Sequence, residues 1–457
     1  MSQHMTMPLP TTHSSHIPFE EFALPNGLRV ILHEDHKSPL VCLNIAYHVG
    51  SKNESIRRRG FAHLFEHLLF DGSKNVPRGA FDEYITQAGG NDNAFTTEDI
   101  TNYYELVPSH QLELALWLES DRMLEFAITQ VGLDTQKSVV KEEKRERYDN
   151  TPYGSMSIHV NRLVYQSFPY WWAVIGDMET IDAATLTDVR TFFETFYVPE
   201  NAVLVLAGDF KSREALELIT RYFGDIPSGR TSIERPVYQE PEQLEERRQI
   251  IDSEPVPLPA VFYAYKIPQE DSREYLALDL LTDIMASGQS SRMYQKLVYE
   301  MQIASEASAF VDGREHPGIL YVYAVAREPG MGIQELENAI AASILELQTN
   351  GVREDELQKA KNKTEARLVA SRVTVQGKAE QLAHSAVIYG DANRANTVLD
   401  DYSTITTAEL LEAARRFLVE SNRSTVVYEA SGVMEVDPNE DSESVLHDLN
   451  STPTIFN

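Results

Sequence analysis

The second half of this 457-residue chain repeats, in the same order, features of the first half about 215 to 221 residues further on. The apolar segment SPLVCLNIAYHVGS from Ser38 resembles LPAVFYAYKIP from Leu258, and NAVLVLAGDF from Asn201 resembles NRSTVVYEASG from Asn422. Between these segments, the helical pattern that runs into LLFDGS is echoed by LLTDIMASGQSSRMY. Self-similarity at a fixed offset is typical of a duplicated unit, so we expect two similar domains.

Each half alternates apolar, β-branched runs with long amphipathic patterns, which indicates an α+β or α/β fold. The segment from Pro236 to Pro259 is rich in proline and charge and is typical of a linker. The last stretch contains acids but no Lys or Arg. We therefore expect five parts: a mobile N-terminus at 1–17, a first domain at 18–235, an interdomain linker at 236–259, a second domain at 260–433 and an acidic C-terminal tail at 434–457.

The 40 basic and 70 acidic residues give a net charge of −30, which disfavours binding to nucleic acid or to anionic membrane surfaces. The single cysteine, Cys42, permits no intramolecular disulfide. No apolar run approaches the roughly 18 residues of a membrane span, and the first residues lack the pattern of a signal peptide. We expect a cytoplasmic protein that does not cross a membrane, with the periplasm as the alternative.

The most informative local motif is GFAHLFEHLLF, in which His63 and His67 are one helical turn apart and Glu66 lies between them. The apolar residues of this segment follow the spacing of one helix face, so the helix is expected to be mostly buried. Buried imidazoles and a carboxylate need partners, and a divalent cation would supply one. The His-x-x-Glu-His pattern is the inverted zinc motif. The simpler alternative is a pair of core histidines bonded to each other or to the glutamate.

Two histidines leave a tetrahedral zinc ion short of a protein ligand. The candidate segment is LDTQKSVVKEEKRERYD, in which Glu143 continues the core-facing stripe of Leu133 and Val140 if the segment is helical. Glu142 would point about a quarter-turn away, and Glu146 is a second possibility. A solvated run of charges on a helix is the alternative interpretation.

Together these motifs resemble the M16 inverzincin metallopeptidases, the family of pitrilysin, insulin-degrading enzyme and mitochondrial processing peptidase. Further matching segments are FALPNGLRVIL at Phe22, AGGNDNAFTTEDITNYYELV at Ala88, VIGDMETI at Val174 and NAVLVLAGDF at Asn201. The resemblance implies two homologous α+β domains, each a mostly antiparallel sheet packed with helices, that face each other as a clamshell. Only the first of these domains would bear zinc.

The resemblance also implies roles for individual residues. The family's third zinc ligand follows the second histidine by about the separation of His67 and Glu143 here, within a VVxEE-like helix. His63, His67 and Glu143 would then hold one Zn²⁺ per chain, and Glu66 would act as the general base toward a zinc-activated water.

The segment GGNDNAFTTEDITNYY resembles the edge strand onto which the family's substrates add as an extra strand. Its expected peptide-binding residues are Asn93, Ala94, Phe95 and Thr96. The alternative is an ordinary edge strand that follows a Gly-Gly turn.

The sequence departs from the family pattern in two respects. Gln136 replaces a second glutamate that active members usually carry seven residues before the ligand glutamate, and an outer group of this kind tunes the metal. In the second domain, LVYEMQIAS places Val298 and Ser305 where one-chain members have an Arg and a Tyr that bind substrate. Arg292 and Tyr294 lie nearby with a different spacing.

Some family members divide zinc binding and substrate binding between two subunits. We therefore expect a zinc-dependent endopeptidase for unfolded peptides, built from this zinc-bearing chain and a homologous M16 subunit that supplies the missing Arg and Tyr. One alternative is a scaffold or interaction subunit with weak or no catalysis. Another is a zinc hydrolase or lyase for a small molecule, for which the sequence holds no signature.

Overall fold

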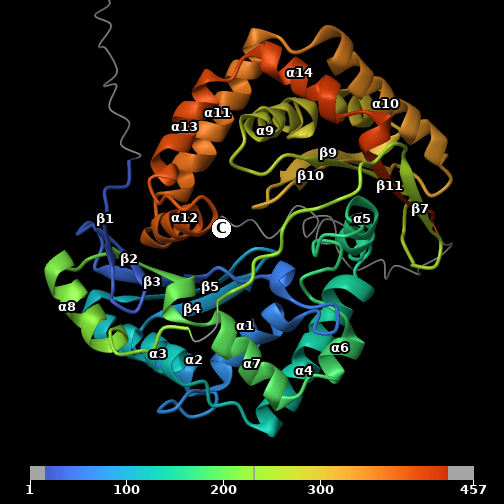
Figure 1. The fold of residues 1–457 in the computed structure, drawn as a ribbon. Coiled ribbons are helices and arrows are strands. Elements are labelled where there is room, and N and C mark those ends of the chain that lie inside the picture. The colour runs from blue at the N-terminus through green and yellow to red at the C-terminus, as the bar shows by residue number, and fades with distance from the viewer. Residues whose placement is uncertain (1–15, 230–231, 431–457) are drawn as a thin grey trace, which may run out of the picture.

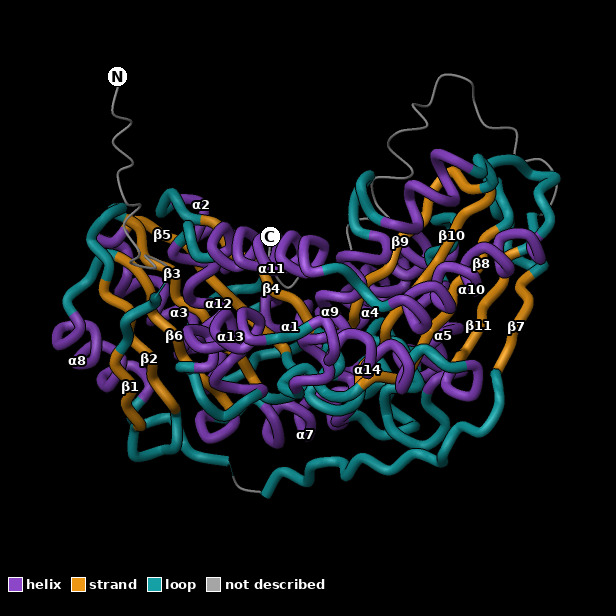
Figure 2. The backbone as a smooth tube through the Cα atoms, turned by 90° about the horizontal axis from the view of Figure 1, so that it is seen from above, coloured by secondary structure: helices purple, strands orange, loops and turns teal. Residues whose placement is uncertain are grey.

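The computed structural model describes residues 16–229 and 232–430 and contains two halves, each built around one β-sheet (Figure 1). Seen from above, the two sheets lie at opposite ends of the molecule with helices between and around them (Figure 2). Within the described ranges, no helix is long and apolar enough to span a membrane. The duplicated α+β architecture expected from the sequence is confirmed.

The first sheet has six strands in the order β1-β2-β6-β3-β5-β4. Strand β2 pairs in parallel with β6, and every other pair is antiparallel. Strand β4 therefore lies at one edge. The strands are β1 (Glu20–Ala23), β2 (Arg29–Glu34), β3 (Leu40–Tyr47), β4 (Asn91–Thr96), β5 (Thr101–Pro108) and β6 (Ala202–Gly208).

The second sheet repeats this arrangement, although residues 232–430 contain no counterpart of β1. Its order is β7-β11-β8-β10-β9, with β7 parallel to β11 and the remaining pairs antiparallel. The repeated sequence segments occupy equivalent strands, because β3 corresponds to β8 and β6 to β11. The strands are β7 (Arg247–Ile251), β8 (Ala260–Ile267), β9 (Ala304–Asp312), β10 (Gly318–Ala326) and β11 (Arg423–Tyr428).

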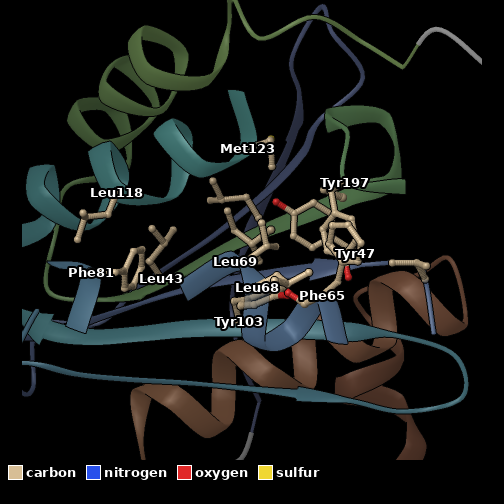
Figure 3. Close-up of a cluster of buried hydrophobic side chains, with 14 of the residues drawn as sticks. Leu43, Tyr47, Phe65, Leu68, Leu69, Phe81, Tyr103, Leu118, Met123 and Tyr197 are labelled. Carbon is tan, nitrogen blue, oxygen red and sulfur yellow. The ribbon is translucent and has the colours of Figure 1, made fainter. Parts of the chain in front are cut away.

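Helices of the first half cover one face of the first sheet. Phe65, Leu68 and Leu69 pack among Tyr47 and Tyr103 of the sheet, and all five are at most 2% exposed (Figure 3). The apolar face predicted for the His-x-x-Glu-His helix is thus confirmed. The helices are α1 (Phe61–Asp71), α2 (Ala80–Gln87), α3 (Leu112–Leu124), α4 (Gln130–Lys144), α6 (Met178–Asp182), α7 (Leu186–Phe196) and α8 (Ser212–Phe223).

In the second half, α9 follows β8 as α1 follows β3, and it packs against α11 as α1 packs against α4. Its apolar residues form a separate core with β8, β9 and β10. The helices are α9 (Arg273–Ala286), α10 (Ile333–Asn350), α11 (Glu354–Ser371), α13 (Arg394–Thr404) and α14 (Thr407–Phe417).

The two halves exchange one helix each. Helix α12 (Val375–Ile388), from the second half of the chain, packs on β3 and β6 and buries Leu382 and Ala383 against the first sheet. Helix α5 (Met156–Val164), from the first half, packs on β7, β8 and β11 and buries Val160 and Val164 against the second sheet. Figure 1 shows α12 beside the first sheet and α5 beside the second.

The predicted boundaries differ from the structure at two places. Strand β7 lies inside the expected linker at 236–259, so the second sheet begins before residue 260. Ile17, expected in a mobile N-terminus, is 1% exposed, and its amide donates to Oδ1 of Asn396 in α13 (2.8 Å). The rest of that N-terminus and the acidic tail at 434–457 lie outside the described residues.

Candidate metal centre and peptide edge

Gly60 is the N-cap residue of helix α1, and its φ of 87° is left-handed. A Cβ there would lie 2.8 Å from the carbonyl oxygen of Ile175, so glycine is needed for this close approach. The buried carboxylate of Glu54 caps the helix, because it accepts hydrogen bonds from the amides of Gly60 and Ala62 (both 2.8 Å) and from Nε1 of Trp172 (3.1 Å). Burial outweighs these donors and raises the pKa of Glu54 to about 8.

Helix α4 carries the predicted third ligand. Leu133 and Val140 are fully buried, as the helical stripe predicted, and Glu143 lies on the same side with a side chain 15% exposed. Glu142 is exposed and pairs with an arginine three residues further on, and Glu146 is also exposed. Of the three acids considered from the sequence, only Glu143 is directed toward α1.

His63, His67 and Glu143 are brought together. Oε2 of Glu143 lies 3.5 Å from Nε2 of His63 and 3.2 Å from Nε2 of His67, and potential ligand atoms of all three lie within 4.8 Å of one another. Among the described residues this is the one group of three or more His, Cys, Asp or Glu side chains with such an arrangement. Three donors from two helices are the number and type that a catalytic zinc site uses.

The electrostatics of this group fit a cation. Oε2 of Glu143 and Nδ1 of His63 are buried and have no hydrogen-bond partner among the described residues, while Oε1 of Glu143 pairs with Arg147 (2.8 Å). Burial would raise the pKa of Glu143, but His63, His67 and Arg147 hold it below its usual range. The carboxylate is thus ionised, with one oxygen directed between two imidazoles.

Glu66 faces the same region from α1 and is held by the edge strand. Oγ1 of Thr96, the last residue of β4, donates to Oε2 of Glu66 (2.6 Å). This contact was not predicted: Thr96 was expected to bind peptide, and its 30-residue separation from Glu66 gives no local signal. The contact joins the edge strand directly to the candidate general base.

Strand β4 has the edge position predicted for peptide binding. Asn93 is exposed, whereas Ala94, Phe95 and Thr96 are half-buried. The amide of Ala94 donates to Oδ1 of Asn93 (2.9 Å), and hydrogen bonds to a neighbouring strand alternate along an antiparallel pair. The backbone groups of Asp92, Ala94 and Thr96 therefore face the open side of the sheet.

The departures from the family pattern have local explanations. Nε2 of Gln136 lies 3.4 Å from Oδ1 of Asp71, so an amide can donate where a second carboxylate would face the first. Val298 packs against the core of the second half, and the hydroxyl of Ser305 donates to the carbonyl of Ala326 (3.0 Å). Arg292 is engaged by the carboxylate of Glu356 (2.6 Å) and does not replace the missing arginine.

Helices α9 and α11 of the second half, which correspond to α1 and α4, are joined by ion pairs. Asp279 and Asp283 of α9 have the same four-residue spacing as His63 and His67, and α9 contains no histidine. Asp279 pairs with Arg367 (2.9 Å) and Asp283 with Lys363 (2.8 Å), both cations lying on α11. The duplicated fold therefore carries the His-x-x-Glu-His arrangement only in its first half.

A duplicated α+β fold with an inverted His-x-x-Glu-His helix beside an edge strand defines a class of two-domain proteins related to zinc peptidases. The chain belongs to peptidase family M16. Residues 29–172 match the family model described as insulinase (peptidase family M16), and residues 183–364 match the one described as the peptidase M16 inactive domain.

Similar proteins span nearly the whole chain. The zinc protease PqqE of Helicobacter pylori is 28% identical over 421 residues, which cover 90% of this chain and 93% of that protein. A probable mitochondrial-processing peptidase subunit beta of Arabidopsis thaliana is 24% identical, covering 80% and 70%.

Solved structures share the fold over similar lengths. The crystal structure of a protease from H. pylori has a TM-score of 0.86 at 27% identity and covers 90% of this chain and 100% of that one. The periplasmic protease PqqL of Escherichia coli has a TM-score of 0.76 at 20% identity. This chain matches over 98% of its own length but spans only 50% of that protein.

Proposed function

We propose that the chain is the zinc-bearing subunit of an M16 metalloendopeptidase that hydrolyses peptide bonds in unfolded peptides. The observation that carries this proposal is the convergence of His63, His67 and Glu143 around a buried oxygen of Glu143, Oε2, that has no hydrogen-bond partner within the part of the chain that the structure describes. Relatives named as zinc proteases support the choice of metal.

Nε2 of His63, Nε2 of His67 and Oε2 of Glu143 are the atoms we assign to one Zn²⁺ per chain. Zinc bound there would polarise the scissile carbonyl and lower the pKa of a water molecule. The two imidazoles would bind in their neutral form, and Glu143 is ionised before the metal arrives.

Glu66 is the residue we assign to proton transfer. It lies on the helix of both histidines but outside the three-donor group, and Thr96 holds one of its carboxylate oxygens. The other oxygen, Oε1, would accept the proton of the attacking water and deliver it to the leaving amine. Thr96 fixes the orientation of the base, which is a positioning role.

Strand β4 gives this site its preference for extended peptides. A substrate strand that pairs with the backbone of Asp92, Ala94 and Thr96 would lie beside Glu66. Such pairing depends on backbone shape more than on side chains, with Asn93 and Phe95 as neighbouring contacts.

A second, homologous M16 subunit would complete the enzyme. Val298 and Ser305 cannot supply the Arg and Tyr side chains that bind substrate in one-chain members, and both are engaged in the second half. The relative described as a subunit beta provides an example of an M16 chain named as part of a larger enzyme. We place the enzyme in the cytoplasm, with the periplasm as the alternative that the description of PqqL suggests.

The alternative function is an M16-fold scaffold or interaction subunit with weak or no catalysis. The match of residues 183–364, which extend from the first half into α11 of the second, to a domain described as inactive supports this alternative. The complete set of His63, Glu66, His67 and Glu143 in the first half favours the peptidase.

The test is zinc content together with cleavage of a quenched fluorogenic peptide, for the chain alone and after co-expression with a homologous M16 subunit. The peptidase proposal expects about one zinc per chain, and activity mainly in the pair. Glu66→Gln should keep the zinc and lose turnover by about a hundredfold or more. Absence of zinc from both preparations would support the scaffold, and full activity of the chain alone would refute the need for a partner.

A further inference from the structure

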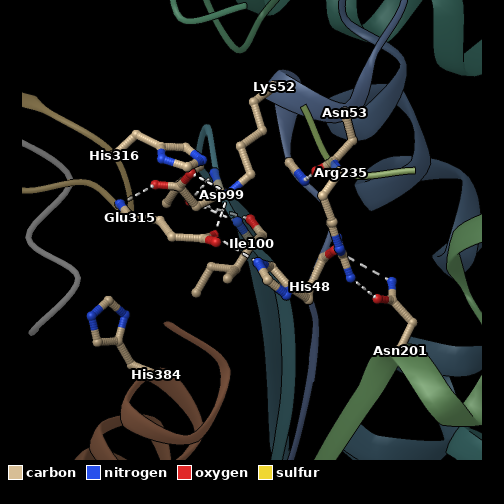
Figure 4. Close-up of polar contacts among 12 residues, drawn as sticks. His48, Lys52, Asn53, Asp99, Ile100, Asn201, Arg235, Glu315, His316 and His384 are labelled. Carbon is tan, nitrogen blue, oxygen red and sulfur yellow. Dashed lines mark hydrogen bonds and ion pairs between the residues drawn. The ribbon is translucent and has the colours of Figure 1, made fainter. Parts of the chain in front are cut away.

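A loop of the second half contacts the turn of the edge hairpin. Residues 97–100 connect β4 to β5, and residues 313–317 connect β9 to β10; we call these the hairpin turn and the clasp loop. Figure 4 shows Glu315 and His316 of the clasp loop beside Asp99 and Lys52 of the first half. This contact joins segments more than 200 residues apart in the sequence.

Asp99 is the centre of the contact. Its Oδ1 accepts from Nζ of Lys52 (2.7 Å) and from the hydroxyl of Tyr170 (2.5 Å), and its Oδ2 accepts from the backbone amide of Glu315 (3.0 Å). The side chain of Lys52 is 1% exposed. Asp99 therefore accepts a hydrogen bond from the backbone of the clasp loop and forms an ion pair with Lys52 of its own half.

The side chain of Glu315 strengthens the same contact. It forms an ion pair with Lys52, and its Oε2 lies 2.6 Å from Nε2 of His48. Burial alone would raise the pKa of Glu315, but His48 and Lys52 lower it to about 2. The clasp loop thus places the ionised carboxylate of Glu315 against the ammonium of Lys52 and the imidazole of His48, both in the first half.

Arg314 of the clasp loop contacts Glu98, the residue before Asp99 in the hairpin turn. Its guanidinium pairs with Oε1 of Glu98 (3.0 Å) and lies over the rings of Tyr165 and Tyr170, with a side chain 3% exposed. Two consecutive residues of the clasp loop therefore contact two consecutive residues of the hairpin turn.

The hairpin turn leads directly to the candidate site. The amide of Thr97 donates to the carbonyl of Ile100 (2.8 Å), which closes the turn, and the preceding residue, Thr96, donates to Glu66. A displacement of Glu98 and Asp99 would move Thr96 and the open backbone edge of β4. The contacts of the clasp loop thus reach both the peptide edge and the base.

We propose that Arg314 and Glu315 are positioning residues that set the place of the edge strand beside the metal centre, so that the half without metal controls peptide binding in the half with it. This inference rests on the proposed peptidase function. It assigns the second half a task in catalysis that needs neither the Arg nor the Tyr of one-chain members.

A test must separate positioning from general attachment of the two halves. The chain offers a matched control in Lys378 of α12, which pairs with Asp35 of the first half at 2.6 Å. Lys378 and Asp35 are 13% and 10% exposed, and they lie on α12 and in the turn after β2, respectively, rather than at the hairpin turn. Lys378→Ala breaks an ion pair between the halves without touching the clasp loop.

The variants are Glu315→Ala, Glu315→Gln and Lys378→Ala, each prepared as the full chain with its co-expressed partner. Hydrogen exchange of peptides that cover residues 91–108 measures the edge hairpin directly. For Glu315→Ala we expect exchange in this segment to rise about tenfold. We also expect KM for a fluorogenic peptide to rise about tenfold, with a smaller change in kcat and unchanged zinc content.

Glu315→Gln keeps the size of the side chain and one acceptor for Lys52, so its hairpin exchange and KM should lie between those of the wild type and Glu315→Ala. It also replaces Glu315→Ala in the test if the alanine variant does not fold. Lys378→Ala should leave both the hairpin exchange and KM at wild-type values. Equal effects of Glu315→Ala and Lys378→Ala, or unchanged hairpin exchange in both Glu315 variants, would overturn the inference. A wild-type pair without zinc or activity would overturn the proposed function, and hydrogen exchange would still decide whether the clasp loop positions the hairpin.

Discussion

Gly132→Ala tests whether the spacing between α1 and α4 determines the geometry of the proposed metal centre. Gly132 lies in the first turn of α4, and a Cβ there would lie 2.3 Å from Oδ2 of Asp71, the last residue of α1. Asp71 cannot move freely because it is 7% exposed and accepts from Nε of Arg78 (2.8 Å). The new methyl group must therefore push the two helices apart or break the Asp71 contacts.

Two opposing contributions determine whether Gly132→Ala raises or lowers the free energy of unfolding. Alanine is favoured over glycine within a helix by about 1 kcal/mol. Overpacking a tightly packed site costs about 1–3 kcal/mol. Because a contact of 2.3 Å is far below any ordinary separation, we expect the clash to prevail and the free energy of unfolding to fall by about 1 kcal/mol net. Displaced helices should also weaken zinc binding by about tenfold, since the proposed ligands come from both helices.

Urea unfolding followed by tryptophan fluorescence suits this variant, because all three tryptophans of the chain, at 117, 171 and 172, lie in the first half. Competition with a chelator measures zinc affinity. Gly332→Ala, where a Cβ meets nothing within 4 Å, controls for the substitution itself, and Asp71→Ala in the Gly132→Ala background should restore stability. A Gly132→Ala chain as stable as the wild type, with unchanged zinc affinity, would refute the reasoning.

Two further predictions concern Thr96 and Glu54. Thr96→Val removes the hydroxyl that donates to Glu66, so kcat should fall about tenfold while zinc content stays constant, whereas Thr96→Ser should keep most activity; equal kcat for Val and Ser would exclude the contact from catalysis. For Glu54, the folded-state pKa of about 8 exceeds the ordinary value of 4.5, so the stability that its neutral form contributes is fully present below pH 4.5 and is lost as the pH rises to about 8. Stability should therefore fall by up to ~1.4 kcal/mol per pH unit across that window relative to Glu54→Gln, and parallel pH profiles of the two proteins in urea unfolding would contradict this.

The parts of the fold that sequence could predict depend on local periodicity or on repetition. The i, i+4 spacing of His63 and His67 and the apolar face beneath them define α1 without any tertiary information. The strands β3, β6, β8 and β11 are apolar runs that recur at one offset, so their equivalence could be predicted as well. Glu143 needed the helical stripe and the family resemblance together, because Glu142 and Glu146 lie in the same run of charges.

The features that sequence did not predict are contacts between distant segments. Nothing in the pattern of Thr96 distinguishes a peptide contact from a hydrogen bond to Glu66, and Glu315 lies in a polar loop that looks solvent-exposed. Strand β7 was missed because RRQII is short and largely polar, at an edge of the sheet where β11 is its one partner among the described strands. The sequences of α5 and α12 do not indicate which sheet each helix covers, because both have the pattern of ordinary amphipathic helices.

The exchange of α5 and α12 affects both folding during synthesis and the outcome of proteolysis. Strands β3 and β6 leave the ribosome long before α12, so the first sheet keeps an apolar face open until the second half has been synthesised. A protease cut between residues 236 and 246 would leave two fragments that stay associated in native gels, because each retains a helix of the other's core. Neither half is then a separable module, because each contributes a helix to the core of the other.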